Sequence, residues 1–181
     1  MVEQLVERIR KKDQRAMSQL YQMYIGELSS VCYRYVPSKE DAKDVLQNSF
    51  LKIFTSIPTL DYRGEPFFRA WMKKVVVNES IDYLRDKKKL MFIEEREDVL
   101  LAIEDDEPIA EQISPDQLHK LISELPAGYR IVLNLYVFEQ KSHKEIAHLL
   151  GIKPETSASQ FSRAKQALAK RINEYLNNSK L

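Results

Sequence analysis

Residues 142–168, SHKEIAHLLGIKPETSASQFSRAKQAL, predict two helices joined by a tight turn. Ser142 and Glu145 have the spacing of a capping box, in which each side chain accepts a hydrogen bond from the other residue's backbone N–H. Gly151 is suited to end the first helix, because glycine readily takes the left-handed conformation found there. Pro154 fits the first turn of the second helix. The stretch therefore predicts a helix-turn-helix, a motif whose second helix can enter the major groove of DNA.

The second of these helices has an apolar stripe and an outward face. The stripe keeps helical spacing and predicts burial of Phe161, Ala164, Leu168 and Ile172. Five residues are left outward, with two more at the edges of that face: Ala158, Ser159, Ser162, Arg163 and Gln166, with Gln160 and Lys165. In the major groove arginine can pair with guanine and glutamine with adenine. The helix is a candidate DNA reader, although the same geometry also occurs in bundles that never touch DNA.

Charge divides the 181-residue chain into three segments. Residues 1–93 hold 17 Lys and Arg against 12 Asp and Glu, residues 94–116 hold 1 against 10, and residues 117–181 hold 10 against 5. Two basic bodies around an acidic segment favour nucleic-acid contact by the ends. The acidic segment is either a solubilising tether or a segment that occupies a basic channel in a partner.

Hydrophobic residues make up 44% of the chain and recur at helical spacing, while glycine occurs only 4 times. This pattern predicts an all-α fold. We expect two small helical domains, residues 1–90 and 115–181, joined by an acidic linker at 91–114. The helix-turn-helix belongs to the second domain.

The helix predicted after Ser38 in the first domain has two distinct faces. One face predicts core through Ala42, Val45, Leu46, Ser49, Phe50 and Ile53. The opposite face is acidic and amide-rich, and it holds Glu40, Asp41, Asp44, Gln47, Asn48 and Leu51. That second face is either a solvated surface or a docking surface for a basic or helical partner.

Two further helices are predicted on either side of this one. The upstream helix precedes Pro37, and its apolar residues keep helical spacing: Leu20, Tyr21, Tyr24, Leu28, Val31, Cys32 and Tyr35. Cys32, the single cysteine, is interpreted as a small core residue rather than a reactive thiol.

Prolines and Gly64 predict a loop at 59–66, and the downstream helix that follows ends in a basic run. We expect at least two of its first aromatics, Phe67, Phe68 and Trp71, to be buried. Further along, one face of this helix holds Asn78, Asp82 and Arg85. Aromatic residues beside basic ones are typical of surfaces that stack unpaired bases.

No constellation of residues in the sequence indicates catalysis, so we expect that the chain is not an enzyme. His143 and His148 are five residues apart, unlike the i, i+4 pair of a zinc helix, and we expect neither a metal nor a cofactor. No apolar run is long enough for a membrane span, and the N-terminal residues lack the pattern of a secretory signal. A single cysteine fits a reducing compartment, and together these features predict a cytoplasmic protein.

Three stretches resemble successive regions of bacterial sigma factors. DAKDVLQNSFLKIF at 41–54 resembles the helix that binds core RNA polymerase, and YRGEPFFRAWMKKVVVNESIDYLRDKK at 62–88 resembles the segment that melts promoters and reads the minus-ten element. ELPAGYRIVLNLYVFEQKSHKEIAHLLGIKPETSASQFSRAKQAL at 124–168 is similar to region four, which reads the minus-thirty-five element. The first two stretches form one block and the third forms another. A chain with only these two blocks, joined by a short linker, resembles the extracytoplasmic-function (ECF) group of the sigma-70 family.

The resemblance implies a role for three sets of residues. The set implied for binding core RNA polymerase is Asp41, Asp44, Gln47, Asn48 and Leu51. The set implied for the minus-ten element is Tyr62, Arg63, Gly64, Asn78, Asp82, Arg85 and Lys88. The set implied for the minus-thirty-five element is Thr156, Ser159, Gln160, Ser162, Arg163 and Lys165. The helices around 125–135 would grip a flap helix of the polymerase.

The function implied is that of a sigma factor, which binds core RNA polymerase, directs it to promoters and has no enzymatic activity of its own. An anti-sigma factor is implied as a further partner. The reading helix departs from the family at Ser157, where an apolar residue is common, and at Ala158 and Gln160, where many members carry Lys or Arg. Its promoter preference therefore cannot be copied from relatives.

Two other functions remain open on the residues alone. The first is a stand-alone helix-turn-helix regulator with an N-terminal interaction domain, which predicts tight DNA binding without polymerase and a dimer that matches repeated half-sites. The second is an interaction module that sequesters a partner and binds no DNA. The acidic face at 40–51 favours a polymerase partner over both.

Overall fold

The computed structural model describes residues 1–87 and 113–178, and every regular element in these two ranges is helical. The chain divides into two units, Met1–Asp86 and Lys87–Leu181. The expected all-α fold is therefore confirmed. Lys88 and the acidic linker up to residue 112 lie outside the described residues.

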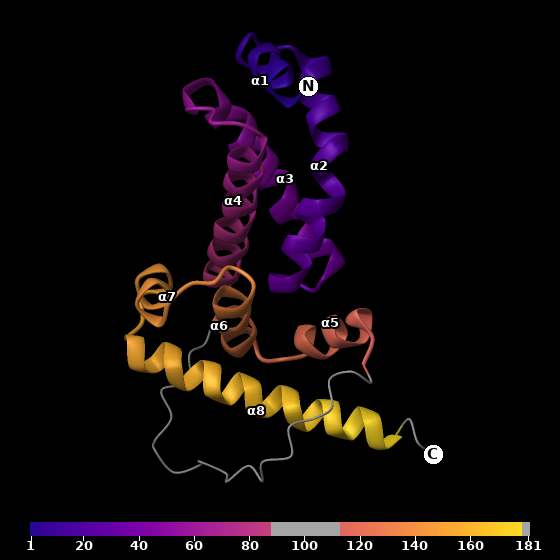
Figure 1. Ribbon diagram of the computed structural model, residues 1–181, viewed down its shortest axis with the longest axis vertical. Helices are drawn as coiled ribbons and strands as arrows, with labels where there is room; N and C mark the ends of the chain where they lie inside the picture. Colours follow the sequence, from indigo (N-terminus) through magenta and orange to yellow (C-terminus); the bar gives the residue numbers. More distant parts are fainter. Residues whose placement is uncertain (88–112, 179–181) are drawn as a thin grey trace. The chain divides into compact units, whose positions relative to one another are not determined.

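The first unit is built on three helices that contact one another, α2 (Gln14–Tyr35), α3 (Lys39–Ser56) and α4 (Glu65–Asp86). They run beside each other in Figure 1, with α1 (Val2–Arg10) packed on α2. A short 3-10 helix, η1 (Ile57–Thr59), follows α3 directly. Side chains cap two of the helices: Asp13 accepts backbone N–H bonds at the start of α2, and Ser38 accepts one at the start of α3.

The core of the first unit follows the predicted helical stripes closely. The buried residues of α3 are the six that periodicity predicts, Ala42, Val45, Leu46, Ser49, Phe50 and Ile53. On α2, Tyr21 keeps the spacing of the apolar stripe but is 43% exposed, and it lies over Phe50 with ring centroids 4.6 Å apart. Cys32 is fully buried, and burial raises the pKa of its thiol to about 11, which fits an inert core residue.

The start of α4 differs from the expected loop at 59–66. The helix already begins at Glu65, because Pro66 falls in the first turn, where a missing N–H leaves no hydrogen bond unmade. Of the three aromatics near its start, only Phe68 is fully buried, whereas Phe67 is exposed and Trp71 is half-buried. The expectation that at least two would be buried is wrong, since the inward stripe of α4 runs from Phe68 through Met72 and Val76.

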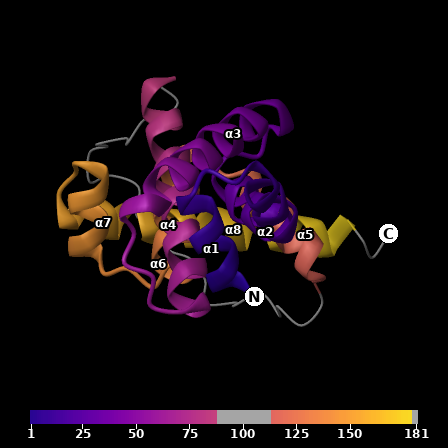
Figure 2. The same ribbon diagram turned by 90° about the horizontal axis from the view of Figure 1, so that it is seen from above.

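The second unit is a long helix, α8 (Pro154–Asn178), on which α5 (Pro115–Ser123), α6 (Ala127–Val137) and α7 (His143–Leu150) pack. Figures 1 and 2 show α5 and α7 toward opposite ends of α8. The helix-turn-helix is confirmed in detail: Ser142 and Glu145 form the capping box, and Gly151 ends α7 with a φ of 69°. The start of α8 at Pro154 also agrees with the sequence prediction.

A buried arginine fixes the turn between α5 and α6. The Arg130 guanidinium donates hydrogen bonds to the carbonyl oxygens of Ser123 at 3.1 Å and Leu125 at 2.6 Å. These carbonyls lie at and just after the end of α5, where no further helical N–H can reach them. The cation thereby supplies donors that the helix end lacks.

Candidate polymerase and promoter interfaces

The outward face of α3 presents most of the predicted polymerase-binding set to solvent. Asp44, Gln47 and Asn48 are exposed, and Leu51 is 57% exposed although it is apolar. Asp41 differs, because it is half-buried and accepts a hydrogen bond from the hydroxyl of Tyr83 on α4. That bond is the main reason why the pKa of Tyr83 rises to about 12. Asp41 thus lies at the edge of the face, against α4.

A groove of about 580 Å³ lies between α2 and α3, beside this face. Two exposed tyrosines of α2, Tyr21 and Tyr33, line it together with Leu51, and Lys39 and Lys43 contribute positive charge. Sequence reasoning missed this groove, because it counted Tyr21 in the apolar stripe of α2 and gave Tyr33 no role. Tyr33 lies outside the apolar stripe of α2, and an aromatic residue outside such a stripe was the available signal.

The loop before α4 is held in place from α1 and α2. Arg10 donates a hydrogen bond from Nη2 to the Leu60 carbonyl at 2.6 Å, and Tyr24 donates one to the Glu65 carboxylate at 3.3 Å. Gly64 has a φ of 96°, a conformation that side chains with a Cβ rarely adopt. Residues 60–64 are therefore a fixed turn attached to the rest of the unit.

Two predicted minus-ten residues in this turn lie in different surroundings. Tyr62 is half-buried and packs near Phe68, with ring centroids 5.9 Å apart. Arg63 is exposed, pairs with Asp61 at 2.7 Å and lies 5.7 Å from the centre of the Phe67 ring. The turn thus presents an arginine and an exposed aromatic ring together, a combination suited to an unpaired base.

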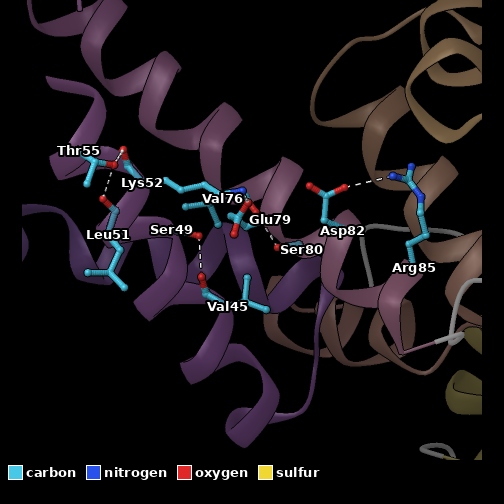
Figure 3. A network of polar contacts seen from close by, with 10 residues as sticks. All are labelled: Val45, Ser49, Leu51, Lys52, Thr55, Val76, Glu79, Ser80, Asp82 and Arg85. Atoms are coloured by element: carbon cyan, nitrogen blue, oxygen red, sulfur yellow. Dashed lines mark hydrogen bonds and ion pairs between the residues drawn. The ribbon is translucent and has the colours of Figure 1, made fainter. Parts of the chain in front are cut away.

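On α4 the predicted face continues toward the end of the helix. Asn78 is half-buried, whereas Asp82 and Arg85 are exposed and form an ion pair at 3.2 Å, as Figure 3 shows. A small polar cleft of about 310 Å³ lies between this part of α4 and α3, and both Asn48 and Asp82 line it. One residue predicted to bind polymerase and one predicted to meet the minus-ten element therefore share a cleft.

The predicted reading helix, α8, exposes only part of its candidate set. Ser159 and Lys165 are exposed, and Thr156, Ser162 and Arg163 are half-buried. The Lys165 ammonium lies 5.3 Å from the centre of the Phe161 ring, where a cation is attracted to the aromatic face.

Gln160 requires a correction. It is 1% exposed, so the prediction that it lies at the edge of the outward face is wrong. The reason is its spacing, three residues after Ser157 and four before Ala164, both of which are fully buried on the inner stripe of α8. A side chain on that stripe faces α6 and α7 rather than a DNA groove.

A cluster that links α6, α7 and α8 was also missed from the sequence. The Nδ1 atom of His143 lies 3.0 Å from the buried Ser157 hydroxyl. The His143 ring stacks on Tyr136 at 4.8 Å, and Tyr136 lies 4.3 Å from Phe161. Aromatic contacts and a hydrogen bond therefore fix α7 against α8 within the helix-turn-helix.

Comparisons with known proteins agree with this arrangement. Residues 20–90 match the family model for Sigma-70 region 2, and residues 116–168 match the model for Sigma-70, region 4. The chain belongs to the ECF group of the sigma-70 family. Sigma factors direct RNA polymerase to promoters, and this chain is a sigma factor.

Several curated sigma factors are similar over nearly the whole chain. The ECF RNA polymerase sigma-E factor of Haemophilus influenzae is 29% identical over 93% of both chains. The ECF RNA polymerase sigma factor SigW of Bacillus subtilis is 23% identical and covers 96% of this chain and 98% of its own. Among solved structures, CnrH in complex with the cytosolic domain of CnrY is 20% identical, with a TM-score of 0.49 over 94% of this chain and 96% of that one.

The described parts of this sigma factor contain no group of histidine, cysteine or acidic residues arranged to hold a metal ion. Across residues 1–87 and 113–178, no helix is both long and apolar enough to cross a membrane.

Proposed function

We propose that this sigma factor binds core RNA polymerase through the outward face of α3, by Asp44, Gln47, Asn48 and Leu51 with Asp41 at its edge. The observation that carries the proposal is this face itself. It holds a largely exposed leucine among acids and amides, on a helix whose other face is the core of the unit. An exposed apolar residue within a polar rim is typical of a protein-binding surface. The neighbouring groove, with its tyrosines, extends that surface.

The minus-ten element would be read by the turn at 60–64 and by α4. Phe67 would stack on an unpaired base and Arg63 would pair with a neighbouring phosphate, with Tyr62 and Gly64 shaping the turn. The DNA strand that continues beyond the unpaired base would be contacted by Asn78, Asp82 and Arg85. Lys88, beyond the described residues, would add a phosphate contact.

The minus-thirty-five element would be read by α8. We assign base contact to Arg163 and phosphate contact to Lys165, with Thr156, Ser159 and Ser162 as smaller polar contacts. Residues near 125–135 would bind a flap helix of the polymerase. Gln160 is left out of the DNA-reading set because it is buried.

A net charge of only +1 fits a chain that binds both the polymerase and the promoter. Much of the affinity for promoters would come from the polymerase, and two modest DNA contacts on one platform would act as a bivalent pair. We further propose that residues 1–90 and 115–181 act as separate functional domains and that the linker at 91–114 follows basic channels of the polymerase.

Three proposals rest on membership of the ECF group alone. The chain would have no catalytic activity of its own, it would work in the cytoplasm, and an anti-sigma factor would hold it inactive. Co-purification of the chain from its native cells, before and after stress, would identify such a partner.

Transcription with purified core enzyme tests the proposed function. Promoters would be mapped from the transcripts that rise when the chain is overproduced. Adding the chain to core enzyme should yield transcripts from these promoters, whereas core enzyme alone should not. A failure of the chain to bind core enzyme would contradict the proposal, as would transcripts that start without regard to the promoter. Repression at these promoters would favour the stand-alone regulator.

A further inference from the structure

Polar side chains tie α3 to α4 along one edge of their contact, as Figure 3 shows in part. The Lys52 ammonium on α3 forms an ion pair with the Glu79 carboxylate on α4. The Glu79 side chain is only 10% exposed, whereas that of Lys52 is 59% exposed. A largely buried carboxylate needs a cationic or hydrogen-bonding partner, so Lys52 holds Glu79 in place and Glu79 fixes the long lysine side chain.

A second tie crosses the same edge. The Tyr83 hydroxyl on α4 donates a hydrogen bond to the Asp41 carboxylate on α3. Asp41 lies near the start of α3 and Tyr83 near the end of α4, whereas Lys52 and Glu79 lie at later and earlier positions of their helices. The two ties therefore follow the antiparallel order of the helices and resist sliding of one helix along the other.

The contact beneath these ties is close and contains small residues. Ser49 on α3 and Ser80 on α4 are both fully buried. Each hydroxyl donates to a carbonyl of its own helix, Ser49 to Val45 at 2.7 Å and Ser80 to Val76 at 2.8 Å. Among the described residues, neither serine is shown bonding across the α3–α4 contact, although the Ser80 hydroxyl also lies 3.9 Å from the Cys32 sulfur on α2. The two ties at the edge are polar bonds between α3 and α4, and they therefore help to set the register of the two helices.

The ties lie between two proposed binding surfaces. The cleft beside them is lined by Asn48 of the polymerase-binding set and by Asp82 of the minus-ten set, together with Lys52, Glu79 and Tyr83. A shift of α4 along α3 would therefore move the DNA-facing residues relative to a polymerase held on α3.

We propose that Lys52, Glu79 and Tyr83 are positioning residues for promoter opening, which hold the minus-ten face of α4 in register with the polymerase-bound face of α3. The proposal rests on the proposed function. It assigns these three side chains no direct contact with DNA. Their effect would appear after polymerase binding, at the step in which the minus-ten strand is captured.

The test compares Tyr83→Phe, Lys52→Glu and the charge swap Lys52→Glu with Glu79→Lys, in the full chain. Affinity for core polymerase would be measured by competition with labelled wild type. Opening would be followed by permanganate reactivity of minus-ten thymines at saturating holoenzyme, and folding by circular dichroism. Thr55→Val is the matched control, because the Thr55 hydroxyl donates only to carbonyls of its own helix among the bonds described, those of Leu51 and Lys52.

The two single variants should keep core affinity within about twofold, because neither Tyr83 nor Lys52 belongs to the proposed polymerase-binding set. They should slow opening by about threefold to tenfold, the effect of one lost charge-assisted hydrogen bond on the geometry of the opening step. The charge swap should recover most of the opening rate, and Thr55→Val should match wild type.

Opening rates equal to wild type in Tyr83→Phe and Lys52→Glu would overturn the proposal, as would losses that only track the melting temperature. A charge swap that opens no faster than Lys52→Glu would also overturn it. These outcomes can be distinguished from failure of the proposed function. In that case the wild-type chain would not bind core polymerase, and both proposals would be contradicted.

Discussion

Ser157 and Gln160 are polar residues on the inner stripe of the reading helix. Both are buried, and the Ser157 hydroxyl meets Nδ1 of His143 at 3.0 Å. Buried polar groups in folded proteins nearly always have a hydrogen-bond partner, and His143 is the partner of Ser157. This contact between Ser157 and His143 helps to hold α7 on α8. Prediction of the stripe from apolar residues could not include Ser157 and Gln160. Gln160 was instead predicted at the edge of the outward face, because a glutamine there could pair with adenine.

Ser157→Ala should lower the stability of the second unit. The substitution leaves His143 facing an apolar neighbour and should cost about 1–2 kcal/mol, the effect of one unsatisfied, partly buried donor or acceptor. Hydrogen exchange of α7 and α8 amides, read by mass spectrometry, measures that cost without interference from the first unit. Equal exchange in variant and wild type would show that the His143 contact contributes nothing.

Arg163→Ala and Gln160→Ala should separate DNA reading from packing. If Arg163 pairs with a guanine edge, its loss should weaken promoter binding by holoenzyme by about 1–3 kcal/mol and relax preference at one base pair. Gln160→Ala should leave base preference unchanged, because the side chain is buried. Binding to a panel of promoters with single base changes provides the readout. A change of base preference in Gln160→Ala would contradict the placement of that residue.

Lys165→Ala should behave differently from Arg163→Ala. A phosphate contact carries no sequence information, so the loss should weaken all promoters alike and lower the slope of log affinity against log salt by about one. The same promoter panel, titrated over a salt series, measures this slope. A loss confined to one promoter sequence would instead assign Lys165 to base contact.

At the scale of one element, α3 divides cleanly into a core face and a binding face. Its six buried residues were all predicted, because a helix buried on one side leaves a strong periodic signal in sequence. The groove beside it was not predictable in the same way, since it depends on where α2 lies. Periodicity tells which face turns inward but not which residue of another helix that face meets. For the same reason neither the Tyr83–Asp41 bond nor the Lys52–Glu79 pair could be predicted.

Asp44→Arg should abolish binding to core polymerase while helicity stays unchanged, because Asp44 is exposed on the outward face of α3. A pull-down with purified core enzyme and a circular dichroism spectrum measure the two properties. Phe50→Asp is the contrasting variant, since a carboxylate in the core should unfold the first unit. Normal binding by Asp44→Arg would remove α3 from the polymerase interface.

At the scale of the whole molecule, charge segregation predicted two basic bodies, and the structure has two helical units. Motif order and spacing carried more functional information than any single side chain. Three stretches in the order of sigma regions pointed to the family far more specifically than the helix-turn-helix alone. Placement of side chains within each interface required the structure, as Asp41 and Gln160 illustrate.

The central claim is that this chain reads promoters as a subunit of RNA polymerase. Fluorescence anisotropy of a labelled promoter duplex tests it directly, with the chain alone, core enzyme alone and both together, over a salt series. We expect weak, non-selective binding by the chain alone and tight, promoter-selective binding only when both are present, because a net charge of +1 gives the free chain little hold on DNA. Tight, sequence-selective binding by the chain alone, unchanged by core enzyme, would contradict the account.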